Sequence, residues 1–205
     1  GSPSGSASGI TGTAYSYSTG GSTSDEGHTV EYRFDWGDGT LSSWSTATSA
    51  SKSWPSTGTY ELKAQARCAS EPLSVSPWSS ALSVTISPPP APEISVSPGS
   101  FTVSLPVGGN DGATLHISNL GDGALTYAVS LSYAGAWLAV SPGSGTVSPD
   151  SVEDLTVSVD ATGLSAGNYQ ANIEVDSNDP LQSEVIVPVT LVVKPPPIVT
   201  TSTAT

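Results

Sequence analysis

The sequence predicts an all-β protein built from two tandem β-sandwich domains joined by a proline-rich linker. Apolar and polar residues alternate along many short segments, which is typical of strands with one buried face. The 205 residues include 17 Pro and 21 Gly, and both residue types favour frequent turns. No segment shows the periodicity of a long amphipathic helix. Together these observations favour short strands packed in layers.

The clearest strand of the first domain ends in a glycine-rich turn. Tyr32, Phe34 and Trp36 alternate with polar residues, and the residues at 37–39 are Gly-Asp-Gly. Glycine tolerates positive φ, so this stretch predicts a strand followed by a tight turn. The alternation places Trp36 in the core, together with Tyr60 on a later strand.

The segment 34–39, aromatic-Asp-aromatic-Gly-Asp-Gly, resembles the hallmark of the PKD domain, an immunoglobulin-like β-sandwich of extracellular proteins. Gly-Thr-Tyr at 58–60 and the apolar alternation at 81–86 are similar to later strands of the same family. The resemblance covers about residues 10–87 and implies an immunoglobulin-like fold outside the cell. Residues 1–9, rich in Ser and Gly, are expected to form a linker or N-terminal extension.

A run of prolines marks the boundary between the two domains. Residues 88–92 read Pro-Pro-Pro-Ala-Pro. Clustered prolines favour the extended polyproline II conformation, so we expect a semi-rigid linker.

Alternation also defines the second domain. Turn residues such as Gly, Pro, Asn and Asp separate its alternating segments, and Pro188 in the last one predicts an edge strand. The predicted strands include residues 115–117, 125–131, 155–159, 169–175 and 185–193.

Several segments of this domain are similar to the BACON family and to related bacterial immunoglobulin-like repeats. The match covers about residues 93–193, and it implies a sandwich used as a spacer or for carbohydrate binding. The segments that carry it are residues 137–147, 163–169, 177–180 and 187–191.

The charge is strongly negative and unevenly distributed. Residues 1–90 carry a net charge of −3 and residues 91–205 a net charge of −10, which sum to −13. Such a surface repels a polyanion, so nucleic acid is not expected as a partner. No apolar run reaches the roughly 18 residues needed to span a bilayer. The low pI of about 4.1 fits an extracellular, secreted protein.

The sequence offers no recognisable catalytic centre. His28 and His116 are expected at the solvated surface, and no nucleophile elbow, nucleotide-binding loop or zinc-binding spacing occurs. Cys68 shares the alternating face of Leu62 and Ala66 and is expected as a small buried core residue. The alternatives for this single cysteine are an intermolecular disulfide or a reactive thiol. We therefore name no catalytic residue, and an enzyme is the weakest hypothesis.

Two kinds of ligand site are considered. Asp25 and Glu26 occupy a turn where PKD domains often carry acidic residues. This resemblance makes structural calcium the one possible cofactor. Two carboxylates, however, fall short of the six to eight oxygen ligands that calcium takes. Sugar binding requires exposed aromatic rings. Trp44 and Tyr133 are the candidates, because Trp54 and the tryptophan at 78 match recurrent packing positions of the PKD pattern.

The C-terminal residues 194–205 form a Pro/Thr-rich linker or a donated strand. Ile198, Val199 and Thr200 are β-prone and could pair with the open edge of a neighbouring copy. The sequence thus favours a non-enzymatic extracellular spacer, stalk or repeating subunit, with self-association or further domains of the same polypeptide as partners. The alternative is an adhesive module that binds polysaccharide or a cell surface.

Overall fold

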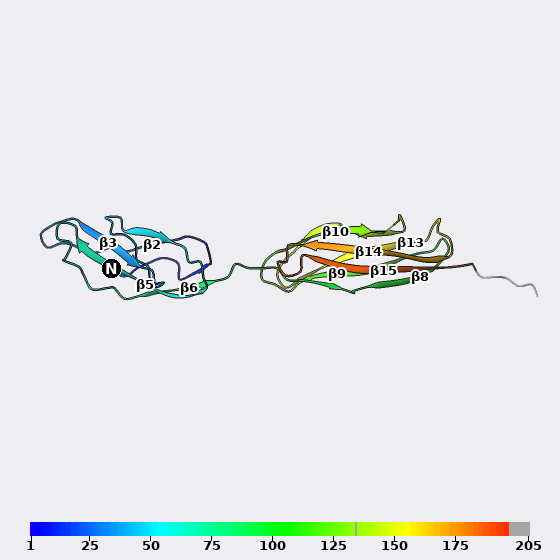
Figure 1. Cartoon of the computed structure of the whole chain (residues 1–205), viewed down its shortest axis with the longest axis horizontal. Helices are drawn as coiled ribbons and strands as arrows, with labels where there is room; N and C mark the ends of the chain where they lie inside the picture. The colour runs from blue at the N-terminus through cyan, green and yellow to red at the C-terminus, as the bar shows by residue number, and fades with distance from the viewer. Residues whose placement is uncertain (134, 197–205) are drawn as a thin grey trace, which may run out of the picture. The chain divides into compact units, whose positions relative to one another are not determined.

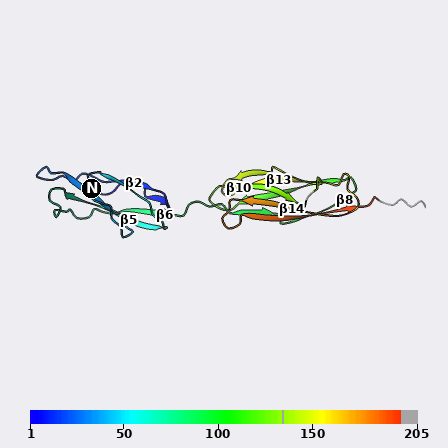
Figure 2. The same cartoon turned by 45° about the horizontal axis from the view of Figure 1, so that its top comes forward.

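The structure, a computed structural model, describes residues 1–133 and 135–196 and confirms the all-β prediction. Every element drawn in the described part is a strand (Figures 1 and 2). The chain divides into two compact units, Gly1–Pro89 and Pro90–Thr205. Within the described residues, no helix has the length and apolarity required to cross a membrane.

The first unit contains six strands in two layers. One layer is a four-stranded sheet in the order β1-β6-β5-β3, and the other contains β2 and β4. Gly58–Leu62 of β5 pairs with β6, and the remainder of β5 pairs with β3. The strands are β1 (Ser8–Ile10), β2 (Tyr15–Ser18), β3 (Val30–Asp35), β4 (Ser49–Lys52), β5 (Gly58–Cys68) and β6 (Leu82–Ser87).

The N-terminal residues, predicted to form a linker or N-terminal extension at residues 1–9, are part of this unit. Ser4 bridges Ser18, and Ser8–Ile10 pairs in parallel with β6. Pro3 is buried. The Ser and Gly content suggested a flexible chain, but their small side chains also suit a segment that crosses from one layer to the other.

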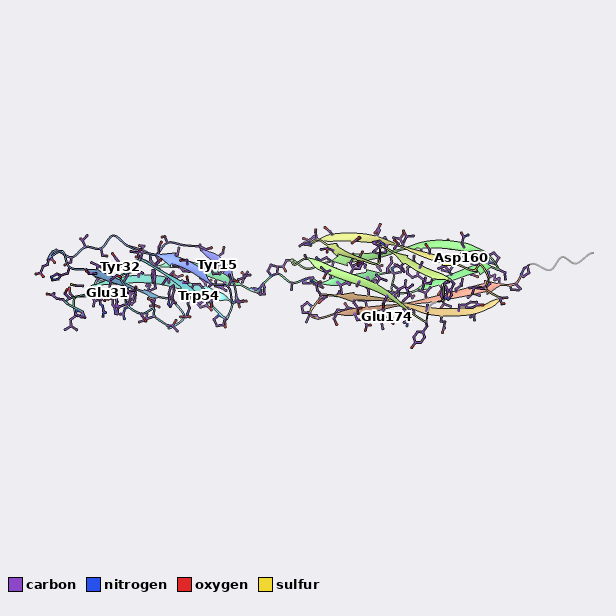
Figure 3. The ribbon with its side chains drawn as sticks, turned by 90° about the horizontal axis from the view of Figure 1, so that it is seen from above. Tyr15, Glu31, Tyr32, Trp54, Asp160 and Glu174 are labelled. Carbon is purple, nitrogen blue, oxygen red and sulfur yellow. The ribbon has the colours of Figure 1, made fainter. Side chains whose placement is uncertain are left out.

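Aromatic rings fill the core of the first unit. Trp54 is fully buried, donates a hydrogen bond from Nε1 to the carbonyl of Trp36 at 3.3 Å, and stacks on Tyr60. Phe34 stacks on Trp36 at 5.2 Å between ring centres. Figure 3 shows Trp54 and Tyr15 among the side chains of this unit. The predicted core positions of Trp36, Trp54 and Tyr60 are confirmed, with Tyr60 half-buried.

The turn after β3 has the predicted geometry. Gly37 and Gly39 adopt φ of 74° and 83°. The Asp35 carboxylate accepts the N–H of Gly37 at 3.0 Å, and Asp38 accepts the N–H of Thr40 at 3.0 Å. Both aspartates therefore act as turn formers.

Within its described residues, the second unit has nine strands in two facing sheets. One sheet has the order β12-β10-β14-β15-β8 and the other β11-β13-β9-β7. The strands are β7 (Ile94–Ser97), β8 (Phe101–Pro106), β9 (Asn110–Asn119), β10 (Leu125–Ser132), β11 (Leu138–Ser141), β12 (Ser144–Val147), β13 (Ser151–Asp160), β14 (Gly167–Ser177) and β15 (Glu184–Lys194).

The strand β15 is internal to its sheet, but Pro188 lies in the part of it that pairs on one side only. Figure 1 shows β14, β15 and β8 side by side, and β15 lies between the other two. Pairing with β8 begins at Val189, immediately after Pro188. Pro188 therefore comes just before the part of β15 that pairs on both sides. Its missing N–H removes no hydrogen bond to β8.

Two buried polar side chains hold the turns at one end of this unit. Asn119 donates from Nδ2 to the carbonyls of Gly123 and Val147 at 2.7 and 3.1 Å. The Asp179 carboxylate accepts the N–H groups of Ile94 and Leu181 at 2.9 and 2.8 Å. The remaining core is aliphatic apart from a few aromatic rings, Trp137 among them.

Candidate functional site

Two irregular segments bring tryptophans onto the outer face of the β3–β5 pair. Residues 41–45 run along β3, with bridges from Leu41 to Asp35 and from Ser45 to Tyr32. Residues 75–79 run along β5, where the N–H of Ser79 reaches the carbonyl of Ala64 at 2.9 Å. Trp44 and Trp78 therefore flank the outward-facing side chains of β3 and β5.

Guanidinium groups of that face stack with these indoles. The guanidinium carbon of Arg33 lies 4.6 Å from the ring centre of Trp44 and 5.2 Å from that of Trp78. Arg67 lies 4.6 Å from the Trp44 ring centre. We call these four residues the Trp–Arg row. Cation–π attraction of this kind stabilises a sheet surface and holds the rings in place.

Polar neighbours fix both arginines. Arg33 donates from Nε and Nη2 to Oε1 of Gln65 at 3.0 and 2.8 Å. Arg67 donates from Nε to Oε2 of Glu31 at 2.7 Å, and Glu31 lies on β3 (Figure 3). Arg67 thus has an acidic partner, whereas the bonds of Arg33 go to a neutral amide.

The structure does not bring the two predicted sugar-binding residues together in one unit. Trp44 is half-buried in the first unit with two guanidinium groups against its ring. Tyr133 belongs to the second unit, is 88% exposed, and has φ of 58°. Trp78, predicted to be a packing residue, is exposed on the Trp–Arg row instead. Its prediction was wrong because the chain after β5 follows the sheet edge and turns the ring outward.

Asp25 and Glu26, the predicted calcium residues, are both exposed. The Asp25 carboxylate accepts the N–H of Glu26 at 3.1 Å, and Glu26 Oε2 lies 3.6 Å from Nδ1 of His28. In the described parts of the chain, no three His, Cys, Asp or Glu side chains gather closely enough to hold a metal ion. Calcium binding here stays a prediction.

Cys68, predicted to be a small buried core residue, is half-buried at the end of β5. Its Sγ lies 3.4 Å from Nδ1 of His28. His28 is correspondingly half-buried and not simply solvated. Alternation carries part of the signal for this pair, since His28 continues the inward phase of Val30 and Tyr32. The register that pairs Val30 with Cys68 is known only from the structure.

His116 is exposed as predicted, but it has a partner that alternation did not reveal. Its Nδ1 lies 2.6 Å from Oδ1 of Asp154. In the register of the sheet, His116 stands opposite Asp154 on β13 and opposite Ser97 on β7. The three residues therefore form a polar row on the outer face of this sheet.

Burial and hydrogen bonds shift several pKa values. Burial raises the pKa of the Tyr127 hydroxyl to about 12, and the nearby Glu153 carboxylate adds to the shift. The N–H groups of Ile94 and Leu181 lower the pKa of Asp179. Burial opposes ionisation of Asp38, but bonds from Lys52 and Thr40 outweigh it and lower its pKa. All three shifts accompany structural contacts.

The residues predicted to mediate assembly, Ile198, Val199 and Thr200, lie outside the described residues. Their pairing with a neighbouring copy stays a prediction.

Comparison with protein families supports the BACON part of the sequence resemblance. The family model of the viral BACON domain matches residues 93–191, which is most of the second unit. The PKD resemblance of residues 10–87 stays a prediction. No curated protein matches the chain.

Solved structures with similar folds come from several sources. One is a PapD-like domain of human CEP192, with 13% identity and a TM-score of 0.44, covering 54% of this chain and 92% of that chain. Another is a protein of unknown function from Porphyromonas gingivalis, with 14% identity and a TM-score of 0.43, covering 88% of this chain and 90% of that chain. A third is SSP-19, an MSP-domain-like protein of Caenorhabditis elegans, with 15% identity and a TM-score of 0.39, covering 48% of this chain and 98% of that chain.

Proposed function

We propose that this chain is a non-enzymatic extracellular module that serves as a spacer, stalk or repeating subunit of a surface appendage or fibre. One observation carries the proposal: the tryptophans and arginines on the outer face of the β3–β5 pair are engaged with one another. The Trp–Arg row stacks on itself, and Arg67 is paired with Glu31. The BACON match of residues 93–191 supports it as well.

The outside location and the PKD-like nature of residues 10–87 are part of this proposal. They rest on the sequence resemblance and on the acidic, lysine-poor composition. A net charge of −13 keeps copies apart in dilute solution, so association would need specific contacts. We assign those contacts to the β-prone residues 198–200, which would add a strand to a neighbouring sheet.

Sedimentation of the full chain and of a chain ending at residue 196 tests the assembly role. We expect the full chain to form linear assemblies visible by electron microscopy and the shortened chain to remain single. If both chains sediment as monomers at all concentrations, the repeating-subunit role is excluded and a spacer within a longer polypeptide remains.

An adhesive, carbohydrate-binding role is the second candidate, and the exposure of Trp78 favours it. The indole is 36% exposed beside Arg33, so one ring and one cation face solvent together on a sheet surface. A glycan array probed with the wild-type chain and with Trp78→Ala, Trp44→Ala and Tyr133→Ala tests this role. If only the two Trp variants lose glycan binding, the Trp–Arg row is the binding surface. An array without bound glycans would exclude the carbohydrate-binding role.

A further inference from the structure

The only cysteine of the chain lies beside a histidine at the end of the first sandwich. Cys68 is the last residue of β5, and His28 precedes β3 in the segment that covers this end. A hydrogen bond of 2.9 Å from the N–H of Ala69 to the carbonyl of Thr29 fixes the two segments relative to each other. Sγ of Cys68 and Nδ1 of His28 are 3.4 Å apart, within hydrogen-bonding distance for sulfur.

The cysteine also lines a hollow. A space of about 260 Å³ lies between the end of β5 and the segment around residues 22–25, and its walls include Val30, Val75, Ser74 and Ser76. These side chains are small or apolar. A compact ligand can therefore enter beside the sulfur without displacing a strand.

An acidic side chain lies beside the pair. Glu26 Oε2 lies 3.6 Å from the same Nδ1, and Asp25 lines the hollow. Arg67 lines it too, but its Nε is engaged with Glu31. The Glu26 carboxylate lies close enough to stabilise the positive charge that appears when His28 takes a proton from the thiol.

We propose that Cys68 is a nucleophilic thiol that captures disulfide-bearing molecules, with His28 as its base. His28 takes the thiol proton at Nδ1, and the Cys68 thiolate attacks one sulfur of the incoming disulfide. The new bond joins Cys68 Sγ to that sulfur, while the old disulfide bond breaks and its second sulfur leaves as a thiolate. That thiolate takes up a proton, so atoms, electrons and charge balance without another oxidant.

This chemistry gives the module a covalent attachment point that differs from strand pairing. The captured molecule becomes a mixed disulfide on Cys68, at the opposite end of β5 from the Gly58 pairing with β6. A small disulfide fits the hollow directly, and a disulfide on a partner protein must be exposed to reach it.

The test is the rate at which the folded chain reacts with two probes, dithiobis(nitrobenzoate) and glutathione disulfide. The rate is measured from about pH 6 to pH 9, because an ordinary thiol is mostly protonated below about 8.5. Wild type is compared with His28→Gln and with His116→Gln, which alters the exposed histidine of the second unit. Cys68→Ser gives the background, and the chain unfolded in urea gives the rate of an unassisted thiol.

We expect wild type and His116→Gln to react at pH 6 at least about tenfold faster than His28→Gln and the unfolded chain. Mass spectrometry should locate the mixed disulfide on Cys68. The proposal is overturned if His28→Gln has the wild-type rate at every pH. It is equally overturned if the folded wild type reacts no faster than the unfolded chain, a comparison that does not depend on any variant folding.

Discussion

The guanidinium carbon of Arg33 lies 4.6 Å from the ring centre of Trp44. Sequence alternation assigns the Arg33 side chain to solvent. The same group lies 5.2 Å from the Trp78 ring centre, so one arginine stacks with indoles from both irregular segments. Those segments have few regular backbone pairs with the sheet. Arg33 therefore contributes to holding them against β3 and β5.

Replacing Arg33 by Ala should destabilise the first unit by about 1–2 kcal/mol, because each exposed cation–π contact contributes roughly 0.5–1 kcal/mol. Urea unfolding followed by tryptophan fluorescence measures the change. Lys63→Ala is the matched control, since Lys63 is half-buried on the same strand pair and has no stacking contact with either indole. Equal losses in the two variants would show that the stacking contributes nothing.

Two glycines in one turn separate backbone strain from steric overlap. Gly37 and Gly39 have similar φ, 74° and 83°. A Cβ on Gly37 would stand 2.6 Å from the backbone nitrogen of Glu61, whereas a Cβ on Gly39 would meet no atom within 4 Å.

Gly39→Ala should therefore lower the free energy of unfolding by only about 1 kcal/mol, the strain of a left-handed backbone at a residue with a side chain. Gly37→Ala should lower it further, because β5 must shift to admit the methyl group. Thermal unfolding of the two variants measures the difference. Equal midpoints would mean that a methyl group on Gly37 fits beside the backbone of Glu61 without displacing β5.

The fold was predictable because period-two alternation is strong where strands have one buried face. Leu155, Val157 and Val159 on β13 are all buried, as alternation predicts. The short Ser-rich strands of the first unit were harder. Ser8–Ile10 forms β1 without any apolar alternation, and only its register with β6 makes it a strand.

Contacts at the candidate sites were less predictable because they depend on register between distant strands. His28 and Cys68 are 40 residues apart, and His116 and Asp154 are 38 apart. Alternation gives the face of a side chain but not its cross-strand neighbour. Trp78 was missed for a related reason, since residues 75–79 form no regular strand whose phase could be read.

The buried carboxylate of Asp179 makes the second unit sensitive to acid. Its pKa is lowered by the N–H groups of Ile94 and Leu181. A carboxylate with a lowered folded-state pKa contributes stability that is fully present above the unfolded value of about 3.9 and is lost as the pH falls through the folded value.

Asp179→Asn should thus lower the unfolding temperature at pH 7 and flatten its decline below about pH 4. Calorimetry over that range measures both effects. Asp176→Asn, an exposed change on β14, should leave the profile unchanged. A variant with the wild-type slope in acid would contradict the role of Asp179.

The Tyr127 hydroxyl is buried and makes no hydrogen bond of good geometry within the described residues. Removing a buried, unpartnered polar group spares its desolvation, so Tyr127→Phe should be neutral or stabilising by up to about 1 kcal/mol. Tyr169→Phe should destabilise instead, because Tyr169 donates to the Ser165 carbonyl at 3.0 Å.

In alkali, the raised pKa of about 12 for Tyr127 means that stability is lost as the pH rises from the ordinary value near 10 towards 12. Urea titrations at pH 8 and pH 11 measure this loss, and Tyr127→Phe should make it smaller. If the free energy of unfolding falls equally between the two pH values in wild type and variant, Tyr127 does not ionise on unfolding.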